Sequence, residues 1–241
     1  MSDPRFDARR REGLLQRWRR PLILIGGAVL VGTLVWAIWF SSLLAATKVV
    51  VDGETTLSEA QIRKAADVPI GQPLARIDTV GIESRVASME RIQAVDVTRS
   101  LPNTIRIEVA ERVPIAYARL GGQLRAIDRY GIAFRTLSKP PKRLLEVSVN
   151  VDDPRKRQQT LSAIASVVES INEKDPKLRR QVQSISASTK DSIILDLSKG
   201  RTVTWGSAGN AERKLTVLNS LLRISAKQYD ISAPDQPTTR N

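Results

Sequence analysis

The chain has 241 residues, with 38 Lys and Arg, 25 Asp and Glu, and neither His nor Cys, which gives a formal net charge of +13 at pH 7. Without imidazole or thiolate groups, the sequence excludes His or Cys zinc sites, Ser-His-Asp triads, Cys nucleophiles, thiol redox motifs and disulfides. A metal or acid–base site would have to be built on carboxylates alone.

The charge is unevenly distributed along the chain. Residues 1–20 contain seven Arg and three acidic residues, residues 21–46 contain no ionisable side chain, and residues 47–241 contain 31 basic and 22 acidic residues. This order is more typical of a membrane protein with a basic N-terminal tail than of a nucleic-acid-binding protein.

Residues 21–46 predict a transmembrane helix, because about 20 apolar residues in a helix span the hydrocarbon core. Four aromatic side chains are expected at the membrane–water boundaries: Trp18, Trp36, Trp39 and Phe40. A buried core helix would show a polar face, and a cleaved signal peptide has a shorter apolar region and a small residue where Leu44 stands. The positive-inside rule places residues 1–20 in the cytoplasm, so we expect a single-pass protein of the cell (inner) membrane with an extracytoplasmic body.

Residues 47–113 predict an α+β module. Its expected elements are a strand at 48–53, a helix from Ser58 to before Pro69, a helix from Asp78 or Thr79 to Met89, and strands at 92–98 and 104–109. Ser58 and Gln61 have the spacing of a capping box. Two helices can cover one face of a three-stranded sheet and bury one core.

Residues 114–232 predict a second mixed α/β module with an extended antiparallel sheet, and the boundary lies near 112–114. Strands are expected at 115–120, 123–127, 132–136, 144–149, 181–187, 192–197, 201–205 and 227–232. One helix is expected after the cap Asp153 and Pro154, with a stripe from Leu161 to Ile171, and another at 211–226. Residues 233–241 are expected to form a polar C-terminal tail.

Enzyme motifs are absent from the sequence. No P-loop, dinucleotide fingerprint or serine acyl-transfer signature occurs. Asp153 is better explained as a helix cap, and Asp152, Asp191 and Asp196 as solvated ends of strands, than as acid–base or metal groups. The aromatic residues do not alternate with basic ones as a nucleic-acid stacking surface requires. We therefore expect no catalytic residues, metal, cofactor or nucleic acid, and a function in protein binding at sheet edges.

Several motifs, in order, resemble the FtsQ/DivIB family of bacterial cell-division proteins, whose first extracytoplasmic module is a POTRA domain. The first module contains Val49-x-Val51-x-Gly53 and the run from Ala65 to Leu74 that reads AADVPIGQPL. The run from Leu101 to Ala116, which reads LPNTIRIEVAERVPIA, ends the first module and begins the second. The second contains Asp128-x-x-Gly131-x-x-Phe134, Val203-Thr204-Trp205-Gly206 with Lys214 downstream, and the run from Tyr229 to Pro234 that reads YDISAP.

The resemblance implies a non-enzymatic scaffold at the division septum that bridges early and late division proteins. It implies binding of FtsB (DivIC in some lineages) and FtsL, single-pass membrane proteins, through a partner strand added to the edge of the second sheet. By alignment that edge lies at Tyr229 to Thr239, with Lys190 on the neighbouring strand as a charged contact. The expected partner-binding residues are Tyr229, Asp230, Ile231, Ser232, Ala233, Pro234, Thr238, Thr239 and Lys190.

Other interpretations accompany this one. Pro234 and Pro237 have no N–H to donate, so strand pairing is expected to be interrupted there, and the segment from 233 could instead be a disordered tail.

Trp205 is expected in the core, and Glu111 and Arg112 are expected to form a salt bridge at the module junction. The rival functions are a POTRA-type polypeptide-transport module of the envelope and a membrane-anchored enzyme that uses carboxylates.

Overall fold

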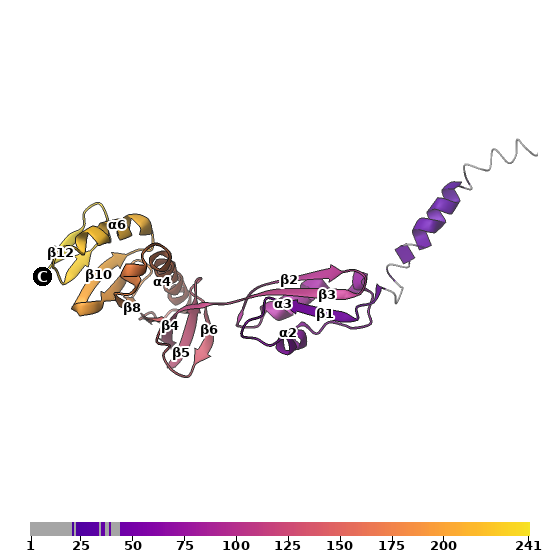
Figure 1. Cartoon of the computed structure of the whole chain (residues 1–241), viewed down its shortest axis with the longest axis horizontal. Coiled ribbons are helices and arrows are strands. Elements are labelled where there is room, and N and C mark those ends of the chain that lie inside the picture. The colour runs from indigo at the N-terminus through magenta and orange to yellow at the C-terminus, as the bar shows by residue number, and fades with distance from the viewer. Residues whose placement is uncertain (1–20, 22, 34, 37–38, 40–43) are drawn as a thin grey trace, which may run out of the picture. The chain divides into compact units, whose positions relative to one another are not determined.

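The computed structural model describes residues 21, 23–33, 35, 36, 39 and 44–241 (Figure 1). The chain divides into two compact units, residues 1–111 and residues 112–241. Each unit is described by itself below.

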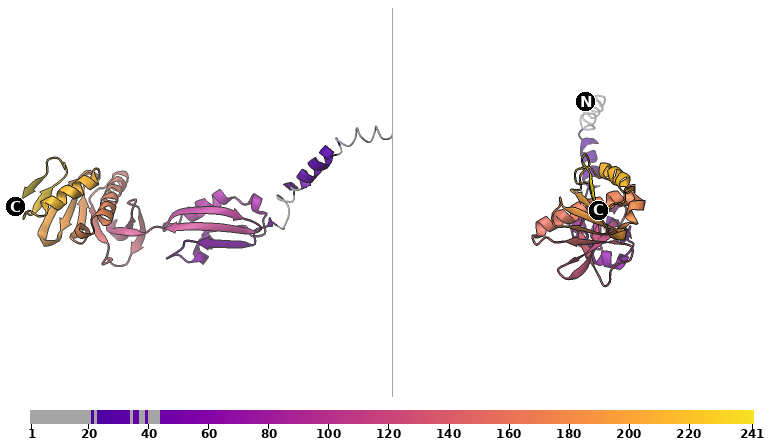
Figure 2. Two further views of the ribbon diagram at one scale, coloured as in Figure 1. Left: turned by 45° about the horizontal axis from the view of Figure 1, so that its top comes forward. Right: turned by 90° about the vertical axis from the view of Figure 1, so that its left-hand side faces the viewer.

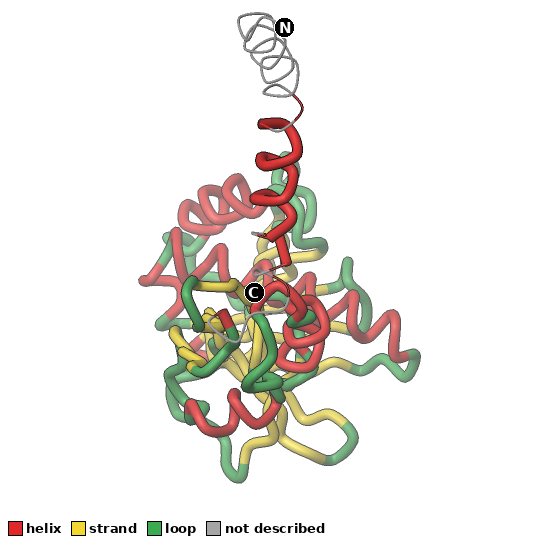
Figure 3. Tube along the Cα trace, turned by 90° about the vertical axis from the view of Figure 1, so that its right-hand side faces the viewer, coloured by secondary structure: helices red, strands yellow, loops and turns green. Residues whose placement is uncertain are grey.

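The segment that we expected to span a membrane is helical at 21, 23–33, 35, 36 and 39 (Figure 3). Within the part of the chain that the structure describes, no helix combines the length and the apolar character needed to cross a membrane. Trp36 and Trp39 are exposed, whereas Trp18 and Phe40, like the basic tail at 1–20, lie outside the described residues.

The last residues of the predicted span, Ala45 and Ala46, pack in the first unit. Ala46 is fully buried in the core of that unit, its N–H donates to the Gln72 carbonyl at 2.9 Å, and its carbonyl accepts from Gly71 at 2.8 Å. Ala45 forms a β-bridge with Pro73. Alanine suits both a membrane helix and a tightly packed turn, so residue type alone could not show whether Ala45 and Ala46 belong to the span or to the first unit.

The first unit is a three-stranded sheet with two helices. Its elements are β1 (Lys48–Asp52), α2 (Glu59–Ala66), the 3₁₀ turn η2 (Leu74–Arg76), α3 (Thr79–Ala87), β2 (Ile92–Ser100) and β3 (Thr104–Glu111). The strand order is β1-β3-β2, with β1 parallel and β2 antiparallel to β3. The predicted order of strands and helices is confirmed.

Local signals in the sequence explain these elements. Ser58 and Gln61 form the predicted capping box at the start of α2, and the Asp78 carboxylate accepts from the Gly81 N–H at the start of α3. On β3, alternate residues from Ile105 to Val109 are buried in one core with residues of α2 and α3. One face of the sheet is therefore covered by helices and the other is open to solvent.

The second unit is a nine-stranded mixed sheet. Its elements are β4 (Pro114–Leu120), β5 (Gln123–Asp128), β6 (Ala133–Leu137), β7 (Leu145–Val149), α4 (Pro154–Lys174), α5 (Pro176–Arg179), β8 (Val182–Ala187), β9 (Ile193–Leu197), the 3₁₀ turn η3 (Ser198–Gly200), β10 (Arg201–Gly206), α6 (Ala211–Leu221), β11 (Gln228–Asp230) and β12 (Thr238–Arg240). The strand order is β12-β11-β10-β9-β8-β7-β4-β5-β6, so β12 and β6 are the two edges.

Helices α4 and α6 lie on the same side of this sheet (Figures 1 and 2). Alternate residues of β8, β9 and β10 are buried in one core with both helices, and Trp205 is fully buried there as predicted. Most residues between them are polar and partly exposed, such as Ser184 and Asp196, which are hydrogen-bonded at 2.7 Å. The opposite face is therefore mainly polar, with Ile194 as an apolar residue on it.

The elements near the end of the chain differ from those predicted. Helix α6 ends at Leu221 rather than 226, and β11 covers 228–230 rather than 227–232. The expected polar tail at 233–241 contains β12, which pairs antiparallel with β11. Thr238 and Thr239 are β-branched residues that suit a strand, but three residues are too short a run to show a period.

The predicted salt bridge between Glu111 and Arg112 is absent, because each side chain binds a partner in its own unit. Glu111 accepts from the N–H groups of Thr55, Thr56 and Leu57 at 2.6, 2.9 and 3.0 Å, and from the Thr56 hydroxyl. Although burial raises the pKa of Glu111, these hydrogen bonds lower it to about 2. Arg112 instead pairs with Asp128 at 2.5 Å.

Candidate functional site

The candidate site is the outer strand pair of the second sheet, β11 and β12. Strand β11 runs parallel to β10, with Val203 opposite Tyr229, and β12 runs antiparallel to β11, with Tyr229 opposite Thr239. Among the strands that the structure describes, β12 pairs with β11 alone. One side of its main chain is therefore open to another strand.

The inner strand is fixed by its side chains. Tyr229 is 1% exposed, its hydroxyl donates to the Ile224 carbonyl at 2.9 Å, and the Ala226 N–H donates to that hydroxyl at 3.3 Å. Ile231 is fully buried, and its N–H donates to the Thr204 carbonyl at 3.0 Å. Tyr229 and Ile231, which we expected to contact a partner, therefore support the edge from inside.

The outer strand has the opposite character, because Thr238, Thr239 and Arg240 are all exposed. On the open face of the sheet, a hollow of about 120 Å³ is lined by residues of β10, β11 and β12: Thr204, Gln228, Tyr229, Asp230, Thr238 and Arg240. Gln228 and Arg240 are polar residues with no motif around them, so the sequence did not indicate them as site residues. Only the strand register, which no local pattern reveals, shows that they are opposite each other.

The loop between the two strands is held at both ends. The Asp230 carboxylate accepts from the N–H and the hydroxyl of Ser232 at 2.9 and 2.7 Å. Asp235 forms an ion pair with Arg213 of α6. Pro234 and Pro237 lie in this loop, outside both strands. Ser232 and Ala233 are exposed, and Pro234 is partly exposed.

The side chain of Lys214 is buried between α6 and the end of β10. Lys214 of α6 is 1% exposed, and its Nζ donates to the carbonyls of Trp205 and Ser207 at 2.8 and 2.7 Å. The same Nζ lies 5.8 Å from the centre of the Trp205 ring. Burial lowers the pKa of Lys214. The side chain thus ties α6 to the end of β10, the strand on which β11 is aligned.

The turn after β10 also contacts the candidate site. Gly206 has φ of +75°, and a Cβ placed on it would lie 2.8 Å from the Cβ of Ser232. A residue with a side chain would therefore be strained and would displace the loop that leads to β12. The run from Val203 to Gly206 and Lys214 supports the edge rather than forming part of it.

Lys190 does not lie on the strand next to the edge, which corrects the expected position. It lies in the turn between β8 and β9, whereas β10 is the neighbour of β11. There it lines a hollow of about 270 Å³ with residues of that turn, of α4 and of the segment before α4: Val151, Lys156, Gln159, Thr160, Ser188, Thr189 and Asp191.

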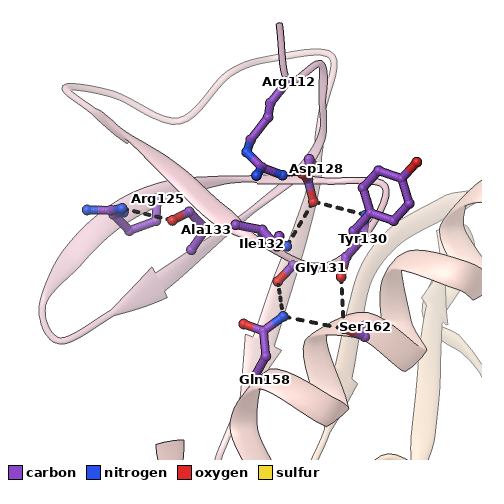
Figure 4. Close-up of polar contacts among 9 residues, drawn as sticks. All are labelled: Arg112, Arg125, Asp128, Tyr130, Gly131, Ile132, Ala133, Gln158 and Ser162. Carbon is purple, nitrogen blue, oxygen red and sulfur yellow. Dashed lines mark hydrogen bonds and ion pairs between the residues drawn. The ribbon is translucent and has the colours of Figure 1, made fainter. Parts of the chain in front are cut away.

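A second polar cluster fixes the opposite part of the sheet (Figure 4). Asp128 is fully buried, and its carboxylate accepts from Arg112 and from the N–H groups of Tyr130 and Ile132 at 2.9 and 2.8 Å. Gly131 has φ of +78° and lies so close to α4 that a Cβ would be 2.4 Å from the Ser162 nitrogen. Gln158 and Ser162 of α4 donate to the carbonyls of Gly131 and Tyr130 at 3.1 and 2.8 Å.

This geometry explains the Asp128-x-x-Gly131-x-x-Phe134 motif. The carboxylate closes the turn, glycine permits contact with α4, and Phe134 is buried on β6. The cluster is structural. Among the described residues, no group of three or more acidic side chains is arranged to hold a metal ion.

Both units are similar to known proteins. A family model described as the POTRA domain, FtsQ-type, matches residues 44–112, and one described as cell division protein FtsQ/DivIB, C-terminal, matches residues 116–233. The chain is 34% identical to cell division protein FtsQ of Streptomyces bingchenggensis, over 95% of this chain and 89% of the relative. It is also 34% identical to cell division protein FtsQ of Streptomyces coelicolor, over 92% of this chain and 88% of the relative. It is 32% identical to that of Mycobacterium tuberculosis, over 85% of this chain and 63% of the relative.

Proposed function

Because this chain belongs to the FtsQ/DivIB family of bacterial cell-division proteins, we propose that it is a non-enzymatic scaffold of the division machinery at the septum. A scaffold needs surfaces that other chains can bind, and the described residues provide one in the open edge of the nine-stranded sheet. Support for this role comes from the family together with that edge.

The partners that we propose are the FtsB/DivIC-like and FtsL-like single-pass proteins, which would add a strand beside β12. The observation that carries this proposal is the exposure of all three residues of β12, which pairs with an inner strand that the buried, hydrogen-bonded Tyr229 holds in place. Strand addition draws its affinity from main-chain hydrogen bonds and its specificity from alternate side chains. An edge that is both accessible and rigid loses little entropy when a partner pairs with it.

Side chains on both faces would contact the added strand. Thr238 and Arg240 line the hollow on the open face of the sheet, whereas Thr239 is opposite Tyr229 and so points to the face that carries α6. Ser232, Ala233 and Pro234 would form one rim of the docking site, because they are accessible and follow β11 directly.

We also propose that residues 21–46 include the membrane anchor, with residues 1–20 in the cytoplasm and both units outside. The support is the absence of ionisable side chains across 21–46, the seven Arg that precede them, and the exposed apolar residues Ile23, Leu24, Ile25, Val29 and Leu30. Cysteines introduced at Ser2 and at the exposed Ala60 test the topology, since the native chain has none. A membrane-impermeant thiol reagent should label position 60 in intact cells and position 2 only after lysis.

Co-purification in mild detergent tests the docking site. The full chain should recover FtsB/DivIC-like and FtsL-like proteins, and a chain that ends at Pro237 should not, because it lacks β12. A control with Thr238→Ser and Thr239→Ser keeps the main chain and should recover both. Equal recovery with the shortened chain would refute the β12 edge, and no recovery by any chain would refute these partners.

A further inference from the structure

The other edge of the nine-stranded sheet carries an unusual concentration of positive charge. Residues 112–143, which include β4, β5 and β6, contain eight Lys and Arg but a single acidic residue. That residue, Asp128, is fully buried and already pairs with Arg112. Arg129 pairs with Glu169 and lies 3.7 Å from Glu173, both of α4. The other six cations are Arg119, Arg125, Arg135, Lys139, Lys142 and Arg143.

The strand register places three of these cations on the sheet: Arg135 on the edge strand β6, Arg125 on β5 and Arg119 on β4. Arg119, Leu124 and Leu137 form one row across β4, β5 and β6, and Arg135 lies two residues from Leu137 on the same face. Leu124 and Leu137 are partly exposed, so this face alternates apolar and cationic side chains. Arg125 lies on the opposite face, where its guanidinium donates to the Ala133 carbonyl at 2.8 Å.

Strand β6 is also open to pairing. Among the described strands it pairs with β5 alone, and its five residues include no proline. The cluster around Asp128 anchors the preceding turn on α4, so this edge is held in place (Figure 4). A second copy of the chain would bring the same cations against this edge, and like charges on neighbouring strands are destabilising. The charge therefore selects against self-pairing and in favour of an acidic strand.

We propose that β6, together with Arg119, Leu124, Arg135 and Leu137, is a second docking edge that takes an extended acidic segment of another protein. The segment pairs with β6 through its main chain and presents alternate Asp or Glu and apolar side chains to this face. The two edges of one sheet then hold two different strands, which goes beyond the proposed role of β12 and does not depend on it.

A fluorescent peptide that alternates Glu and Val over twelve residues is the probe, with the full chain in detergent as the receptor. We expect binding measured by anisotropy to weaken at least about tenfold with Arg119→Glu and Arg135→Glu, because two favourable charges become unfavourable. The matched control is Arg155→Glu with Arg180→Glu, two exposed cations outside 112–143, and should change affinity less than about twofold. If the first pair disturbs folding, Arg119→Gln with Arg135→Gln removes the charge more gently.

Three further results decide between the alternatives. A peptide with the same Glu content but Gly and Pro in place of Val should bind poorly, since it cannot form a strand. Equal binding of that peptide would overturn the strand proposal in favour of a general polyanion site. A chain that ends at Pro237 should bind the probe like the full chain, and loss of binding would place the probe at β12 instead. Equal loss in the control pair would also overturn the proposal.

Discussion

The two units stabilise their folds in different ways. All four buried polar side chains of the described residues lie in the second unit: Asp128, Thr160, Asp175 and Lys214. The described residues 44–111 of the first unit bury only apolar side chains, and their carboxylates act at the surface as caps and turn acceptors. The first unit is therefore an apolar core with local caps, whereas the second also depends on buried polar contacts.

Three of the four buried polar groups share one task, which is to hold a turn or a helix in place, whereas Thr160 donates to the Lys156 carbonyl within α4. Asp128 closes the turn that contacts α4, and Lys214 ties α6 to the end of β10. Asp175 caps α5 through the Leu178 N–H and accepts from Asn219 of α6 at 2.7 Å. Such contacts cost desolvation, so they are maintained where geometry matters. Here they surround the sheet whose two edges we propose as docking sites.

The units also differ in charge. Residues 47–111 contain eight basic and ten acidic residues, whereas residues 112–241 contain 23 basic and 12 acidic residues. The excess of positive charge over residues 47–241 therefore belongs entirely to the second unit. Acidic partners are expected to associate with that unit faster, and this effect should weaken as salt screens the charges.

Replacing Asp128 is expected to have the largest effect on stability. Asp128→Ala should lower the free energy of unfolding of the second unit by about 3–5 kcal/mol, because it leaves Arg112 without its carboxylate and two turn N–H groups without an acceptor. Urea unfolding followed by Trp205 fluorescence measures this, with the other three Trp replaced by Phe. In the first unit, Asp78→Ala removes only a helix cap and should lower the free energy of unfolding by about 1 kcal/mol. Hydrogen exchange of the first unit measures this change. Equal costs would contradict the comparison between the units.

Lys214→Met should have the next largest effect, about 1–3 kcal/mol in the same assay, because two buried carbonyls lose their donor. Since burial lowers the pKa of Lys214 in the folded state, its protonation opposes folding. The contribution of Lys214 to stability should therefore rise as the pH increases from the lowered pKa toward the unfolded value, and Lys214→Met should abolish that rise. Lys227→Met, at an exposed lysine, is the control. An identical pH profile in native and Lys214→Met chains would contradict the burial argument.

Glu111→Gln should destabilise the first unit by about 1 kcal/mol at pH 7, once solvent screening of this partly exposed carboxylate is considered. Its pKa is lowered from 4.5 to about 2, so its contribution is complete above pH 4.5 and is lost as the pH falls toward 2. Hydrogen exchange of residues 55–57 at pH 7 and at pH 3 should show a difference between native and variant chains that shrinks at the lower pH. A difference independent of pH would show that the charge of Glu111 is not involved.

The smallest effect on stability is expected from ending the chain at Pro237. The residues removed are exposed and lie outside both hydrophobic cores, so the free energy of unfolding should change by less than about 0.5 kcal/mol. Thermal unfolding of native and shortened chains measures this. A large loss of stability would mean that β12 is structural rather than available for a partner.

Most of the fold could be predicted from the sequence, because its elements have strong local signals. Period-two alternation on β3, the Ser58 capping box and Asp153 before Pro154 located their elements correctly. The rest depends on pairing between distant residues. Strand β12 is too short to show a period, the end of α6 has no glycine or proline, and Lys190 could be placed only from the order of the strands. Tyr229 and Ile231 are predicted as partner contacts from the sequence, because residue type alone does not show whether a side chain near a sheet edge is buried.

The central claim is that a partner strand pairs with β12, and hydrogen exchange of the complex tests it most directly. The amides of β12 that point away from β11 should exchange rapidly in the free chain and slowly when the FtsB/DivIC-like and FtsL-like proteins are bound, while those of β1 to β3 remain unchanged. A complex that forms without protecting these β12 amides would contradict the account.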